Sequence, residues 1–241
     1  MDAFCSLLFN SEGVASVVDI LNNLTVRSSL DIVLMLTSFY ITPAEYDLPR
    51  LTSEHFVDRT LELLRDQCGG DVSLSMILEA CRAQKGSLYH FFPNGKEALY
   101  AAAVEKMGHC ATTHIQKCIE ETDSASEAVQ QHLRELAKLI DQPNSPVGMP
   151  FLVLAATIGA SNDGVRIACE KAISSIESLF SKQLIKDGFA TRDAKRLATF
   201  CVLSVDGAIL ASRSQGNTQA LKLAAKTLGK LFTCTANRNL N

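Results

Sequence analysis

Apolar side chains recur every three or four positions along most of this chain, the spacing that places them on one face of a helix. Breaks rich in Gly, Pro, Asn and Ser separate the periodic segments and mark their ends. The pattern predicts an all-α fold. In chain order, the expected helices cover residues 53–68, 73–80, 84–91, 96–120, 124–140, 151–158, 165–186, 192–213 and 219–232.

The first fifty residues are less informative than the rest. Apolar positions in 14–24 fit a helix, whereas 30–41 fit either a second helix or a buried strand. Pro43 and Pro49 then indicate a linker. Residues 1–52 are therefore expected to form an N-terminal extension of unknown role, either an added cap on the next domain or an extension from an upstream start site.

One stretch, residues 84–99, combines a short helix with a turn and the start of a long helix; it reads QKGSLYHFFPNGKEAL. Leu88 and Phe91 fall on an apolar face that must be buried, while Lys85 and Ser87 fall on the polar side. One face of the short helix is expected to anchor it, and the other to be presented to a partner.

The turn that follows is specified by its residue types. Pro93 lacks an N–H and disfavours helix in the preceding residue, so the short helix is expected to end before it. Gly95 favours a turn, and Lys96 then opens the next helix. A helix start with a lysine beside it would suit a phosphate.

The run Gly86 to Pro93, followed by Gly95, Lys96, Glu97 and Leu99, resembles the end of the helix-turn-helix in TetR-family transcriptional regulators. The Asn94-Gly95 pair is similar to the branch that includes LmrA and YxaF. The resemblance implies a helix-turn-helix DNA-binding domain at 53–100. It also implies a larger helical ligand-binding and dimerisation domain at 101–234, with a polar tail at 235–241.

The resemblance further implies contacts with a double-stranded DNA operator. A mixed role is expected for Tyr89, with its ring packed on Leu74 and its hydroxyl reaching outward. The residues expected at the DNA are Ser73, Arg82, Lys85, Gly86, Ser87, Tyr89, His90 and Lys96.

Four positions depart from the family pattern, and each departure removes a turn former, a cap or a phosphate donor. Arg82 stands where the family has a glycine in the turn, and Gln84 where it has a capping Ser or Thr. Cys68-Gly69 replaces a Gly-aromatic pair, and Val72 replaces a threonine.

For the larger domain, the resemblance implies a homodimer through helices at about 165–186 and 192–213, and Val205-Asp206-Gly207-Ala208 carries part of the likeness. It also implies a small lipophilic or aromatic effector. Adaptable apolar side chains with few polar groups suit such a ligand. The candidate lining residues are Met107, His114, Met149, Phe151, Leu154 and Phe180.

Composition restricts the partners and the compartment. The formal net charge is -3, and 51–100 holds more acidic than basic side chains, so DNA binding would need a local basic patch. The 8 cysteines include no C-x-x-C pair and indicate buried thiols in a reducing compartment. No leader pattern or long uninterrupted apolar run appears, so a cytoplasmic protein without membrane contact is expected.

The residues do not favour a metal site or an enzyme. Cys110, His114 and Cys118 share a helix face, but three ligands along one helix span about 12 Å and cannot all bind one ion. They predict a buried stripe between helices, with no metal and no cofactor. No catalytic motif such as G-x-S-x-G or H-E-x-x-H occurs, so no enzyme is expected.

The sequence thus predicts a ligand-responsive dimeric regulator, most simply a repressor. The alternative is a dimeric small-molecule-binding protein of the same fold that has lost DNA binding, motivated by Arg82, Val72 and the local acidic excess.

Overall fold

The computed structural model describes residues 51–67, 70–140, 142 and 149–234. The described residues all belong to one compact unit. The expectations for the leading extension, for Cys68-Gly69 and for the tail fall outside the described residues.

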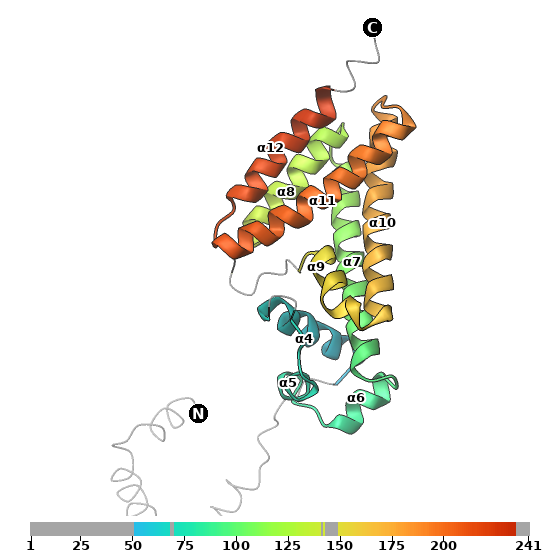
Figure 1. Cartoon of the computed structure of the whole chain (residues 1–241), viewed down its shortest axis with the longest axis vertical. Helices are drawn as coiled ribbons and strands as arrows, with labels where there is room; N and C mark the ends of the chain where they lie inside the picture. The colour runs from blue at the N-terminus through green and yellow to red at the C-terminus, as the bar shows by residue number, and fades with distance from the viewer. Residues whose placement is uncertain (1–50, 68–69, 141, 143–148, 235–241) are drawn as a thin grey trace, which may run out of the picture. The chain divides into compact units, whose positions relative to one another are not determined.

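Every regular element in the described part of the chain is helical, which confirms the predicted all-α fold (Figure 1). The elements are α4 (Ser53–Asp66), α5 (Leu74–Ala80), α6 (Lys85–Phe91), α7 (Lys96–Glu120), α8 (Ala125–Ile140), α9 (Phe151–Ala156), the 3-10 turn η1 (Ile158–Ala160), α10 (Asp163–Lys186), α11 (Thr191–Gln215) and α12 (Gln219–Cys234).

Local sequence explains several of the helix ends. The hydroxyl of Ser124 accepts from the backbone N–H of Glu127, and the Glu127 carboxylate accepts in return from that of Asp123. This is a capping box whose return bond is displaced by one residue, and it begins α8. Asn162 caps α10 through its side-chain oxygen. Gly216, in the left-handed region, ends α11.

The long helix α7 connects the two ends of the described unit (Figure 1). Its start lies with α5 and α6, and α4 packs along it; its later turns lie against α8 and α10. α10 also packs on α11, and α12 packs on α8 and α11. Contact between α7 and α10 is close, because a Cβ added at Gly108 would lie 2.8 Å from the Cβ of Ala172. One buried core runs through the unit and joins the small helices to the large bundle.

Candidate functional site

The connection between α5 and α6 is a tight turn that holds an arginine in a conformation suited to glycine. α5 begins at Ser73, whose hydroxyl accepts from the backbone N–H of Met76 at 3.2 Å. At its end, Ala83 donates to the carbonyl of Leu78, and Arg82 donates to that of Glu79. This is the Schellman pattern, and Arg82 occupies its left-handed position with φ 50°. The expected turn is therefore present, with its glycine replaced.

α6 is anchored on one side and exposed on the other. Leu88 is fully buried, while Lys85, Gly86, Tyr89 and His90 are exposed. The Lys85 ammonium lies 5.8 Å from the Tyr89 ring centroid, within cation–π range. A Cβ at Gly86 would meet nothing within 4 Å. The four exposed residues thus form one continuous polar and aromatic surface.

Ser87, also expected at the DNA, is partly buried. Gln84, which stands where the family has a capping Ser or Thr, is exposed and begins α6 without a side-chain capping bond. Tyr89 is 42% exposed, and its ring lies over Gly95. A Cβ added at Gly95 would be 3.1 Å from Cε1 of Tyr89. Gly95 itself has φ 69° and ψ −144°, a region open almost only to glycine.

Lys96, expected on phosphate, is engaged within the chain. Its Nζ donates to Asp71 Oδ1 at 2.7 Å and to the carbonyl of Val72 at 3.2 Å. The hydrogen bond from Lys96 is the main cause that holds the pKa of Asp71 below its ordinary value. The buried hydroxyl of Tyr100 also bonds to the backbone of Val72. This network fixes the start of α7 beside α5.

A cavity of about 570 Å³ lies in the bundle between α4, α7, α8, α10 and α11. Five of the six expected lining residues are in its wall, namely Met107, His114, Met149, Phe151 and Phe180. Leu154 is not; it is buried in the core instead. The wall is mainly apolar, which suits a lipophilic ligand.

Sequence reasoning missed the part of the wall that comes from other helices. α11 contributes Val202, Val205 and Asp206, and α8 contributes His132 and Leu136. An apolar stripe shows that a helix is buried, but it does not show which of its residues border a void. Val205 and Asp206 are singled out only by the family likeness, and Val202, His132 and Leu136 carry no local signal that could have identified them as cavity wall.

Three polar groups meet at the α8 side of the cavity. His114 Nδ1 lies 2.8 Å from His132 Nδ1, and His114 Nε2 lies 2.7 Å from Glu135 Oε2. Burial, helped by the neighbouring His114, lowers the pKa of His132 to about 3, so His132 is neutral at pH 7. The hydrogen bond from His114 is the main cause that lowers the pKa of Glu135.

A second polar group connects two walls of the cavity. The carboxylate of Asp206, on α11, accepts from the backbone N–H of Leu152 at 2.9 Å in the first turn of α9. Burial raises the pKa of Asp206 to about 6, although backbone hydrogen bonds from Leu152 and Phe151 act in the opposite direction.

The cavity also borders the small helices directly. Asp58, Leu61, Glu62 and Arg65, all from α4, line it. At the same place Lys106 of α7 donates to Asp58 at 2.6 Å and to Glu54 at 2.9 Å. A molecule in the cavity would therefore contact the helix that supports α5 and α6.

Comparison with known proteins agrees with this arrangement. Residues 125–227 match the family described as "Transcriptional regulator LmrA/YxaF-like, C-terminal domain". The chain is 34% identical over 155 residues to the uncharacterized HTH-type transcriptional regulator YxaF of Bacillus subtilis (strain 168), covering 64% of this chain and 81% of that protein. It is 31% identical over 148 residues to the HTH-type transcriptional regulator LmrA of the same organism, covering 61% and 79%.

Solved structures share the fold at lower identity. One is the TetR-family transcriptional regulator CifR, as a cysteine mutant complexed with 26bp double-strand operator DNA. It superposes with a TM-score of 0.63 and 21% identity, covering 75% of this chain and 97% of that one. The TetR-type regulator from Legionella pneumophila gives a TM-score of 0.64 and 20% identity, covering 75% and 97%.

Proposed function

The chain belongs to the TetR family of HTH-type transcriptional regulators, in its LmrA/YxaF-like branch, and from this premise we propose that it is a cytoplasmic dimeric repressor released from its operator by a small lipophilic or aromatic effector. The observation that carries the proposal is the placement of α4. Its Phe56 packs against Phe91 of α6, with ring centroids 6.0 Å apart, and its outer residues form a wall of the cavity.

The DNA part of the proposal rests on α6. Its buried Leu88 fixes the helix, while Lys85, Tyr89 and His90 face solvent, as a helix that enters a major groove requires. The bond of Lys96 to Asp71 leaves Lys85 and Arg82 as the more available cations. A DNA phosphate would have to compete with Asp71 for Lys96.

The dimer part rests on an apolar face of α11. Phe200, Leu203 and Leu210 are exposed there, near Gly207, where an added Cβ would meet nothing within 4 Å. α11 is long and apolar enough to cross a membrane by length and composition alone. However, α11 packs between α10 and α12 and carries the buried Asp206, which favours a core helix over a membrane span. Its exposed apolar face would pair with a second copy of the chain.

The effector part rests on the contact between cavity and α4. A ligand that fits the cavity better in one orientation of α4 would shift the chain toward that orientation. Lys106, which pairs with Glu54 and Asp58, is positioned to hold α4 to α7 in one of the two states. Such a shift would change the spacing of the two α6 helices in the dimer and weaken operator binding.

A gel-shift series on DNA from upstream of the chain's own gene, at low and moderate salt with unrelated DNA as competitor, tests the proposal. The regulator predicts salt-sensitive retardation that is selective for that DNA. Absence of retardation at any salt would instead favour a dimeric small-molecule-binding protein of the same fold.

A further inference from the structure

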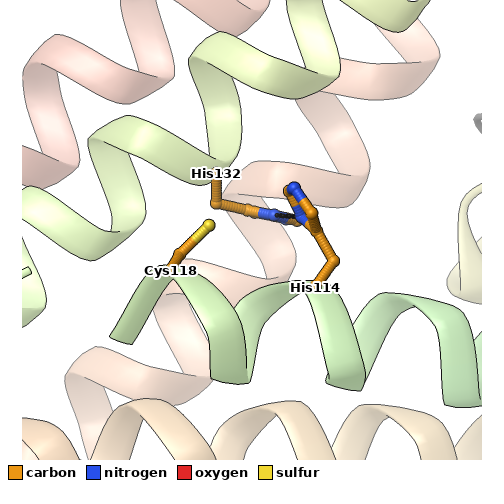
Figure 2. A group of neighbouring side chains, drawn as sticks. All are labelled: His114, Cys118 and His132. Atoms are coloured by element: carbon orange, nitrogen blue, oxygen red, sulfur yellow. Dashed lines mark hydrogen bonds between the residues drawn. The ribbon is translucent and has the colours of Figure 1, made fainter. Parts of the chain in front are cut away.

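Three side chains of the types that bind transition metals converge between α7 and α8. They are His114, Cys118 and His132. Each offers one ligand atom, an imidazole nitrogen or the cysteine sulfur, and these three atoms all lie within 4.8 Å of one another. In Figure 2, His114 and Cys118 rise from α7 toward His132, which descends from α8. The group draws on two helices, unlike the single-helix set of Cys110, His114 and Cys118.

The helix geometry explains why these three meet. His114 and Cys118 are four residues apart on α7, so they lie one turn apart on one face. α8 packs on that face and brings in His132. Cys118 and His132 are buried, whereas Cys110, two turns earlier on α7, is an exposed thiol in the cavity wall and does not belong to the group of three.

The hydrogen bonds around His114 prepare it as a ligand. Its Nε2 donates to the Glu135 carboxylate, which also accepts from the side chain of Gln131 at 3.1 Å. With its proton on Nε2, His114 directs the lone pair of Nδ1 at His132. A carboxylate behind a histidine in this way is the usual outer support of a metal-binding imidazole.

We propose that His114 Nδ1, Cys118 Sγ and His132 Nδ1 form a three-ligand Zn²⁺ site. Two imidazoles and a thiolate match the ligand preference of zinc, while Mg²⁺ and Ca²⁺ require oxygen ligands. Zinc bonds of about 2.0–2.3 Å in a tetrahedron place the ligand atoms roughly 3.3–3.6 Å apart. The two Nδ1 atoms, now 2.8 Å apart, would separate by about half an ångström as the ion replaces the shared hydrogen. His132 would then carry its proton on Nε2 instead of Nδ1, and the Cys118 thiol would release its proton to solvent.

The fourth coordination position would face the cavity. His114 and His132 both line the cavity. A zinc ion here would close the α8 end of the cavity and leave one site for water or for a ligand atom, as in zinc sites with three protein ligands. The inference does not depend on DNA binding.

Titration of the purified full chain with Zn²⁺, in competition with a chromophoric chelator, tests the site. We expect one Zn²⁺ per chain, and at least about 100-fold weaker binding for Cys118→Ser. Cys110→Ser, which removes an exposed thiol from the same helix, is the matched control and should bind as the wild type does. Glu135→Gln, which keeps all three ligands, should weaken binding by about 10- to 100-fold.

Titration with Co²⁺ identifies the sulfur ligand. A thiolate-to-cobalt charge-transfer band in the near ultraviolet should appear in the wild type and in Cys110→Ser, and should be absent from Cys118→Ser. If Cys118→Ser does not fold, the band and the effect of Glu135→Gln still decide the matter. No bound Zn²⁺ in the wild type, a Co²⁺ spectrum without the band, or equal affinity in Glu135→Gln would overturn the proposal.

Discussion

At the scale of single residues, the departures from the family pattern at Arg82 and Gln84 have visible structural consequences. The position of Arg82 requires a left-handed backbone, and Gln84 leaves α6 without a side-chain cap. Sequence comparison located both positions, because a turn between two short helices has a narrow choice of residues. It did not reveal that Lys96 is paired with Asp71, since that contact joins residues far apart in the sequence.

Arg82→Gly is predicted to stabilise the chain while weakening its hold on DNA. A non-glycine residue in the left-handed region costs about 1–2 kcal/mol, and the flexibility of glycine in the unfolded chain returns part of the gain. The free energy of unfolding should rise by about 0.5–1 kcal/mol, measured by denaturant titration. Ala83→Gly, at a position without positive φ, should lower the free energy of unfolding. A lower free energy of unfolding for Arg82→Gly would contradict the claim that the backbone at Arg82 is strained.

Gly95→Ala is predicted to destabilise the chain. The backbone at Gly95 is unfavourable for alanine, and the new Cβ would press on the Tyr89 ring. We expect a loss of about 1–3 kcal/mol in thermal or denaturant unfolding. Gly86→Ala serves as control, because its Cβ would enter open space in a helix and should raise stability by up to about 1 kcal/mol. Equal effects at the two positions would count against this account.

At the scale of helices, their order and extent were predictable and their packing was not. α7 runs from Lys96 to Glu120 as expected, because a turn precedes it and its apolar period is long. The wall of the cavity depends on which turn of α8 and α11 lies against α7 and α10. That register is set by long-range packing, so His132 and Asp206 could not be assigned from their neighbours in sequence.

Asp206 connects α11 to α9 and gives a pH-dependent prediction. Its pKa is raised from 3.8 to about 6, so near pH 5 the folded chain holds a proton that the unfolded chain releases. The contribution of Asp206 to stability is therefore complete below about pH 4 and declines as the pH rises through about 6.

Asp206→Asn removes this group while keeping an acceptor for the α9 backbone. Its stability relative to the wild type should increase between about pH 4 and pH 7, by up to about 3 kcal/mol. Denaturant unfolding across that range measures the difference. Asp193→Asn, a partly exposed carboxylate in the first turn of the same helix, should show no comparable change. Parallel curves for Asp206→Asn and the wild type would refute the pKa shift.

At the scale of the whole molecule, the account needs two copies of the chain. Leu203 is 51% exposed on the apolar face of α11, whereas Leu223 is 67% exposed on α12. Leu203→Glu should place a charge in the dimer interface and yield a monomer in analytical ultracentrifugation, with loss of operator binding. Leu223→Glu adds the same charge outside that face and should leave a dimer. A dimer in both variants would move the interface away from α11.

The central claim is that α6 presents its exposed face to DNA. The most direct test is fluorescence anisotropy with a DNA fragment bound by the wild type, titrated at several salt concentrations with Lys85→Ala and Lys226→Ala. Lys226 is exposed on α12, so its substitution removes the same charge far along the chain from α6. Lys85→Ala should weaken binding and reduce the slope of log affinity against log salt by about one, while Lys226→Ala should match the wild type. Identical slopes for all three proteins, or no salt-dependent binding by the wild type, would contradict the account.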